Sequence, residues 1–189
     1  MKQPLEEYLG TPYNHPMTNT LKEIREFLQI GENIFSSGQP TEDQLKMLGD
    51  DGFSTVINLA TAQSPDSIPN EKEIVMNAGM AYVHIPVDWA NPTRSDLEKF
   101  FAMFDKFDHY KTFVHCARNM RASVFIFLFR VLVLKEDLEK CWQNVLDIWE
   151  PDETWQKFLQ QMLVEIKEPI NTRDWIIDWS GYISFNNQK

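Results

Sequence analysis

The chain has 189 residues, of which 43% are hydrophobic and 13% aromatic, enough apolar material for one globular domain and too much for a disordered chain. Its formal net charge of −10 leaves no basic stripe for nucleic acid or for an anionic membrane surface. Two cysteines, Cys116 and Cys141, do not suggest a disulfide framework. No apolar stretch of signal-peptide length is found near Met1, which predicts a cytoplasmic protein.

The first part of the chain predicts an arm followed by a strand, a helix and a second strand. Residues 1–27 contain several prolines and asparagines, a composition typical of an extended N-terminal arm. A short strand is expected at 33–36. Thr41, with Gln44 three residues later, predicts a capping box at the start of a helix, and a strand at 53–59 follows.

The alternation of helices and strands continues through the middle of the chain. A second helix is expected from Asn70, and a strand at 80–85 follows it. Ser95, with Glu98 three residues later, predicts the start of a third helix with a face rich in phenylalanine. The next strand is expected at 111–115, the centre of the predicted sheet.

Three further helices are predicted, at about 122–134, 138–149 and 154–166, the first of them apolar enough to be the central buried helix. The pattern predicts an α/β fold, with a small, mostly parallel central sheet flanked by helices, in a domain of residues 28–168. Residues 169–189 form an aromatic C-terminal tail that is expected to pack on this domain.

Residues 112–123, Thr-Phe-Val-His-Cys-Ala-Arg-Asn-Met-Arg-Ala-Ser, carry the strongest functional pattern. A strand that ends at Cys116 leads into a tight loop whose N–H groups converge, and the next helix adds its positive N-terminal end. This strand–loop–helix arrangement predicts a phosphate cradle. The same field favours the nucleophilic thiolate form of Cys116, which indicates displacement at phosphorus. Arg121 would hold two phosphoryl oxygens with its planar guanidinium.

These residues bear a family resemblance. Val114-His115-Cys116, followed by Arg121 and Ser123, resembles the phosphate loop of the cysteine-dependent protein tyrosine and dual-specificity phosphatases. Three upstream segments resemble a bacterial branch of proteins assigned as phosphatases, related to the beta-lactamase-hydrolase-like group: residues 36–42, 56–60 and 84–89. The resemblance covers roughly residues 28–160. It implies a metal-independent phosphomonoesterase that acts through a cysteinyl-phosphate intermediate.

The loop departs from the family pattern in its length. Four residues separate Cys116 from Arg121, where the best-known phosphatases have five. The shorter loop also resembles that of rhodanese-type sulfurtransferases, so a sulfurtransferase is an alternative to a phosphatase. The glycine often found in the middle of the loop is absent, and Asn119 stands near its place. Asparagine tolerates positive φ better than most residues, so the turn can still form.

The resemblance also implies a set of substrate-binding residues: His115, Ala117, Arg118, Asn119, Met120 and Ser123. His115 is expected to orient the loop through hydrogen bonds, which a buried structural histidine would also form. Arg118 either selects substrates at the rim of the pocket or is a solvated loop charge. The hydroxyl of Ser123 either stabilises the departing thiolate or is a polar residue in the first helical turn.

A phosphatase needs an acid that protonates the leaving oxygen and later accepts a proton from water. Asp88 is the preferred candidate, because it follows a predicted strand in the loop where related enzymes carry a mobile acid. Asp96 is the rival, although its place near a helix start is explained by a favourable interaction with the helix dipole.

No cofactor is expected, and the spacing of the histidines indicates no metal site. The predicted partner is a phosphorylated protein or a small phosphomonoester, with neither nucleic acid nor membrane involved. A third hypothesis is a catalytically weak phosphate-binding module, which would apply if neither Asp88 nor Asp96 reached the loop.

Overall fold

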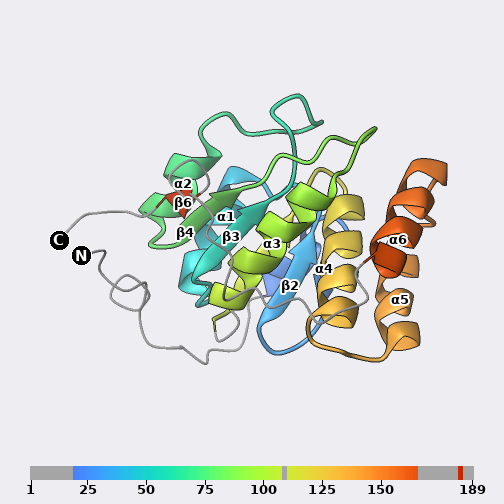
Figure 1. The fold of residues 1–189 in the computed structure, drawn as a ribbon. Coiled ribbons are helices and arrows are strands. Elements are labelled where there is room, and N and C mark those ends of the chain that lie inside the picture. The colour runs from blue at the N-terminus through green and yellow to red at the C-terminus, as the bar shows by residue number, and fades with distance from the viewer. Residues whose placement is uncertain (1–18, 108–109, 166–182, 185–189) are drawn as a thin grey trace, which may run out of the picture.

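The computed structural model describes residues 19–107, 110–165 and 183–184 and centres on a six-stranded sheet of order β1-β2-β5-β3-β4-β6 (Figure 1). The strands are β1 (Leu28–Gln29), β2 (Ile34–Ser37), β3 (Thr55–Asn58), β4 (Ala81–His84), β5 (Thr112–His115) and β6 (Ile183–Ser184). The four central strands are parallel, and the two short edge strands are antiparallel to their neighbours. The predicted α/β fold with a mostly parallel sheet is confirmed.

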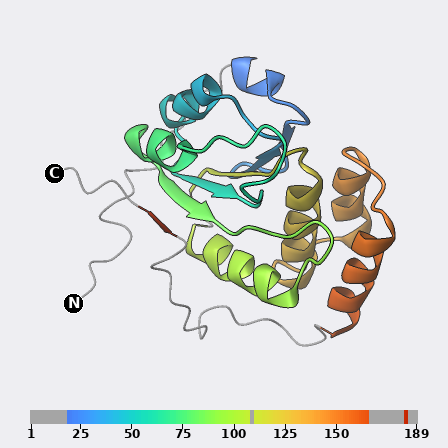
Figure 2. The same ribbon diagram turned by 90° about the horizontal axis from the view of Figure 1, so that it is seen from above.

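Helices cover both faces of the sheet, as Figure 2 shows. They are η2 (Asn19–Glu23), α1 (Glu42–Asp50), α2 (Glu71–Asn77), α3 (Arg94–Lys106), α4 (Met120–Leu132), α5 (Leu138–Leu146) and α6 (Glu153–Glu165). The short helix η2 lies with α1 and α2 on one face. Helices α3 and α4 lie on the other face, where α5 and α6 pack against α4.

The sheet divides the core into two hydrophobic clusters because successive strand residues point to opposite faces. Val56 and Phe113 pack with η2, α1 and α2, whereas their neighbours Ile57 and Val114 pack with α3 and α4. All four side chains are fully buried, as expected of central parallel strands covered on both faces.

Helix α4 is buried around almost its whole circumference, as its apolar sequence predicts. One side faces the sheet and α5 and α6 cover much of the rest. Arg130 is one of two buried charges in α4, the other being Arg121, and Glu136 Oε2 accepts hydrogen bonds from the Arg130 guanidinium at 2.9 and 2.6 Å. Asn144 accepts another at 2.7 Å, so burial of this charge is compensated.

The N-cap residues of the helices can be compared with those predicted from the sequence. The capping box of Thr41 and Gln44 is confirmed at α1. The predicted start of α3 at Ser95 is wrong, because Thr93 is the N-cap and forms a capping box with Asp96. Both Thr93 and Ser95 are followed three residues later by an acid, and the earlier start adds two residues, about half a turn, to the helix. Asn70 precedes α2 without a side-chain cap bond.

The ends of the chain are described only in part. Of the expected N-terminal arm, Leu21 and Ile24 are buried in the core, so this portion packs with the domain. The remainder of the arm, residues 1–18, lies outside the described residues, as does the expected aromatic tail except for Ile183–Ser184, which pairs with β4. Within the described ranges, no helix is both long and apolar enough to cross a membrane.

Gly49 allows α1 to approach α2 closely. A Cβ at this position would lie well inside van der Waals contact with the backbone carbonyl oxygen of Ala78, which has no freedom to rotate away. Gly49→Ala should therefore lower the free energy of unfolding by about 1–3 kcal/mol through overpacking, although alanine favours a helix interior by about 1 kcal/mol.

Urea denaturation checks this, with Gly31→Ala as the matched control, because a Cβ at Gly31 meets nothing within 4 Å. The control should stay within about 0.5 kcal/mol of the wild type. A Gly49→Ala variant as stable as the wild type would show that α1 and α2 can separate without cost.

Candidate active site

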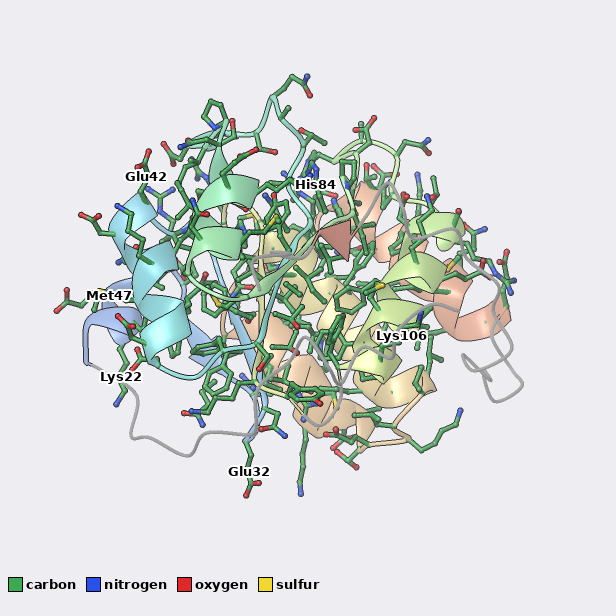
Figure 3. The ribbon with its side chains drawn as sticks, turned by 90° about the vertical axis from the view of Figure 1, so that its left-hand side faces the viewer. Lys22, Glu32, Glu42, Met47, His84 and Lys106 are labelled. Carbon is green, nitrogen blue, oxygen red and sulfur yellow. The ribbon has the colours of Figure 1, made fainter. Side chains whose placement is uncertain are left out.

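The carboxyl ends of the parallel strands meet at one edge of the sheet. The register aligns Ser37 and Asn58 with His115, and Asn58 with His84. Figure 3 shows His84 at this end of the molecule and Glu32, which precedes β2, at the opposite end. Loops that follow parallel strands gather at such an edge, where ligands bind in open α/β sheets.

A cavity of about 410 Å³ lies at this edge. Its lining residues come from the loops after β3, β4 and β5 and from the first turn of α4: Thr61, Gln63, Ser64, Pro65, Asp88, Trp89, Cys116, Ala117, Arg118, Met120 and Arg121. The structure thus brings together Cys116, Arg121 and Asp88, the three residues expected to be catalytic. Cys116 is only 1% exposed and Asp88 is exposed, so the thiol lies deep in the cavity and the carboxylate near its mouth.

The loop after Cys116 turns into α4 through a left-handed residue. Asn119 has φ 59° and ψ −4°, the positive φ expected at this position. Its side-chain Nδ2 donates to the Glu26 carbonyl at 2.6 Å and to Ser36 Oγ at 3.0 Å. Asn119 does not line the cavity, and its amide holds the loop against the segments before and within β2. The turn also starts α4 two residues earlier than predicted, so Arg121 lies in its first turn.

A glycine lets the end of β2 approach this loop. Gln39 N donates to the Ala117 carbonyl at 3.2 Å, and Gly38 N donates to the Arg25 carbonyl at 2.7 Å. A Cβ on Gly38 would lie 3.0 Å from the Ala117 oxygen and 3.2 Å from the Arg25 oxygen, both backbone atoms. The absence of a side chain at position 38 therefore permits the contact between the two loops.

The guanidinium of Arg121 is fixed along one edge. Its Nη1 donates to the carbonyls of Leu59 at 3.0 Å and Val87 at 3.2 Å. Its Nη2 donates to Ser64 Oγ at 3.0 Å. The Nε atom is buried without a hydrogen-bond partner. Nε–H and the second Nη2 hydrogen thus remain for a planar, bidentate contact with an oxyanion.

The two candidate acids lie in different surroundings. Asp88 Oδ1 accepts from Ala90 N at 2.9 Å, and the side chain lines the cavity. Asp96 does not line the cavity. Its Oδ2 accepts from Thr93 N at 3.3 Å and Thr93 Oγ1 at 2.6 Å, so it is engaged at the start of α3.

Of the other expected substrate-binding residues, Arg118 lines the cavity and Ser123 does not. Arg118 is exposed and lines both the main cavity and a neighbouring one of about 270 Å³, which Met120 also lines. Ser123 Oγ donates to the Met120 carbonyl at 2.9 Å and accepts from Trp149 Nε1 at 3.2 Å. Ser123 does not line the cavity, and its hydroxyl is engaged by groups at the start of α4 and after α5.

The sequence pattern missed a buried carboxylate beside the loop. Glu71 is 2% exposed, and His115 is fully buried. Glu71 Oε1 lies 3.0 Å from His115 Nε2 and accepts from Asn58 Nδ2 at 2.8 Å. Glu71 Oε2 accepts from Gln39 Nε2 at 2.6 Å. As the first residue of α2, Glu71 resembles any first-turn acid, and only its contacts with distant segments set it apart.

These contacts stabilise the ionised form of Glu71. Burial by itself would raise the pKa of this carboxyl, but the charge and hydrogen bond of His115, with hydrogen bonds from Gln39 and Tyr82, lower it to about 2. Burial, together with the Glu71 charge, raises the pKa of the Tyr82 hydroxyl well above its ordinary value. Because a carboxylate only accepts hydrogen bonds, Nε2 of His115 carries the hydrogen in this pair.

Ser64 is a second residue that the sequence did not single out. Its hydroxyl accepts from Arg121 and from Thr61 N, at 3.1 Å, within the loop after β3. The position of this loop after a central parallel strand was the available signal. Among the described residues, no cluster of three or more histidine, cysteine or acidic side chains could hold a metal ion.

Comparison with known proteins gives a consistent result. Residues 18–163 match the family model described as DSP-PTPase phosphatase fused to NAD+ Kinase. A crystal structure from Shewanella putrefaciens CN-32, named as a phosphatase of the DUF442 group, is similar to this chain. The two sequences are 34% identical and the structures superpose with a TM-score of 0.70. The match covers 78% of this chain and 97% of that one. No curated protein matches the sequence.

More distant structures share the fold. Tk-PTP in its active form is 20% identical with a TM-score of 0.60, over 77% of this chain and 98% of that one. PTPMT1 in complex with PI(5)P is 16% identical with a TM-score of 0.63, over 74% and 96%. The predicted resemblance to cysteine-dependent phosphatases is confirmed. The chain belongs to the DSP-PTPase family described as fused to NAD+ kinase, within the superfamily of protein tyrosine and dual-specificity phosphatases.

Proposed function

We propose that the protein hydrolyses phosphomonoesters through a cysteinyl-phosphate intermediate, with Cys116 as the nucleophile. One observation carries the proposal: the buried Cys116 and Arg121, whose Nε has no hydrogen-bond partner, line the same cavity. An unpaired buried donor costs free energy, about 1–3 kcal/mol. A phosphoryl oxygen would satisfy it and so recover that cost on binding.

In the first step the phosphoryl group binds in the 116–121 loop. The N-terminus of α4 and the free edge of Arg121 stabilise its negative charge. The Cys116 thiolate attacks phosphorus, and an S–P bond forms as the ester P–O bond breaks. Asp88, protonated and at the mouth of the cavity, gives its proton to the departing oxygen, so the product leaves as a neutral alcohol or phenol.

In the second step water hydrolyses the phosphocysteine. The Asp88 carboxylate takes a proton from water as the new P–O bond forms, and the S–P bond breaks to return the thiolate. The N-terminus of α4 stabilises that thiolate. Ser123 is less suited to this task, because its hydroxyl is bonded to Met120 and Trp149 outside the cavity lining.

The depth of the cavity bears on the substrate. Since Cys116 is almost fully buried, the phosphate must project from a group slim enough to enter. Trp89 and Pro65 belong to the wall, and the exposed Arg118 can contact a second polar group of the substrate. A phosphorylated protein or a small phosphomonoester meets these requirements. The sulfurtransferase alternative is not favoured, because the matched family is one of phosphatases.

Replacing the nucleophile tests the covalent mechanism. Cys116→Ser should abolish hydrolysis of p-nitrophenyl phosphate while phosphate still binds, because a hydroxyl is similar in size but far less ionised than a thiol. Arg121→Lys should lose both, since a lysine lacks the planar fork. Initial rates and phosphate titration by calorimetry measure the two effects.

Thiosulfate with cyanide serves as the parallel assay for sulfur transfer. Wild-type rates of phosphate release from Cys116→Ser would show that no cysteinyl phosphate forms. Sulfur transfer by the wild type without phosphatase activity would replace the proposed function with that of a sulfurtransferase.

The dependence on leaving group tests Asp88. Asp88→Asn should slow the hydrolysis of alkyl and phenyl phosphates by about 100-fold or more, the usual contribution of a general acid. Esters whose phenolate leaves without a proton should lose much less. The basic limb of the pH–rate profile should flatten, because the group that must stay protonated is gone.

Asp96→Asn is the matched control, because it removes one carboxylate that lies outside the cavity lining. It should reduce the rates for all leaving groups equally, if at all. A graded loss in Asp96→Asn and a uniform loss in Asp88→Asn would assign the acid to the start of α3.

A further inference from the structure

We propose that Glu71 is a positioning residue. It fixes the backbone on both sides of Cys116, and it fixes the turn whose carbonyl accepts a hydrogen bond from Arg121. Glu71 does not line the catalytic cavity. It acts through three neighbours, each of which contacts a different part of the site. The inference rests on the proposed function for its catalytic consequence, although the hydrogen bonds that carry it are independent of the reaction.

The first neighbour is the residue before the nucleophile. His115 is the last residue of β5, and its side chain lies on the face covered by α2, opposite to the face on which Cys116 packs. Glu71 Oε1 accepts the Nε2 hydrogen of His115 at 3.0 Å. This bond fixes the imidazole and, with it, the backbone from which Cys116 projects.

The second neighbour reaches the residue after the nucleophile. Gln39 donates its side-chain amide to Glu71 Oε2 at 2.6 Å. Its backbone N–H donates to the Ala117 carbonyl at 3.2 Å. Glu71 is therefore linked to the loop on both sides of Cys116, once through His115 and once through Gln39.

The third neighbour leads to the arginine. Asn58 donates to Glu71 Oε1 at 2.8 Å, and its own Oδ1 accepts from Ala60 N at 2.7 Å. Between these residues lies Leu59, whose N–H donates to the His115 carbonyl at 2.8 Å. The Leu59 carbonyl accepts from Nη1 of Arg121, so Asn58 holds the turn that presents this acceptor.

A carboxylate suits this position because the donors of His115, Asn58 and Gln39 converge on it, in addition to the Tyr82 hydroxyl. Its two oxygens accept these hydrogen bonds without offering a donor of their own. A glutamine has one acceptor oxygen and one amide nitrogen, so at least one of these bonds must be lost or rearranged. Glu71→Gln keeps the size of the side chain and changes only this pattern and the charge.

Loss of these bonds should affect the reaction more than substrate binding, since small errors in the placement of reacting groups reduce rates steeply. We expect Glu71→Gln to lower kcat for p-nitrophenyl phosphate by about 10-fold or more while KM changes less than about threefold. Affinity for vanadate, which resembles the transferring phosphoryl group, should fall in parallel with kcat. Glu73→Gln is the matched control, because Glu73 lies exposed on the same helix.

A double-mutant cycle separates positioning from general destabilisation. In a His115→Asn background, Glu71→Gln should cause less further loss of kcat than in the wild type, because part of its effect passes through His115. A purely structural effect would give equal losses in both backgrounds. If Glu71→Gln fails to fold, Gln39→Leu, which removes one of these donors to Glu71, should lower kcat and vanadate affinity several-fold.

The outcomes distinguish this inference from the proposed function. An active wild type with Glu71→Gln indistinguishable from Glu73→Gln would overturn the positioning role and leave the phosphatase intact. The wild type could instead hydrolyse no phosphomonoester but bind vanadate more tightly than Glu71→Gln does. That result would overturn the proposed function and support the positioning role of Glu71 in an oxyanion-binding loop. If Glu71→Gln and Glu73→Gln bound vanadate equally well in that case, the positioning role would be overturned too.

Discussion

The parallel register of the central strands is the constraint on which the site depends. Because Ser37, Asn58 and His115 are aligned at the carboxyl end of the sheet, the three loops that follow start within hydrogen-bonding distance of one another. The Leu59 amide bonds back to the His115 carbonyl, and the Gln39 amide bonds to Ala117. A one-residue slip would move His115 to the opposite face and away from α2, so the register itself selects which side chains meet.

Some buried polar groups in this region have several hydrogen-bond partners, whereas others have none. The carboxylate of Glu71 is surrounded by donors, whereas Nε of Arg121 and Nδ1 of His115 are buried without partners. Burial of unpaired polar atoms is unfavourable, and such atoms are rare in folded proteins. At Arg121 the free edge belongs to a cavity, so the fold leaves unsatisfied the donors that a bound oxyanion would use.

Much of the framework follows from local sequence, and the rest depends on contacts between distant segments. The capping box at Thr41, the positive φ of Asn119 and the fold class could be predicted, since each depends on neighbouring residues or on a regular pattern. Local pattern could not decide between the two possible starts of α3. Glu71 and Ser64 were missed because their partners, His115 and Arg121, lie 44 and 57 residues further along the chain.

The charge of the whole chain and that of the site differ in sign. A net charge of −10 repels phosphorylated ligands at long range, but salt screens such repulsion beyond about 10 Å. In the proposed reaction the ligand would meet the buried Arg121 and the N-terminus of α4 inside the cavity, and the exposed Arg118 at its rim, all at short range. Short-range terms in a less polar environment are the stronger ones. The acidic surface therefore slows the approach of an anion, while the loop determines whether it stays.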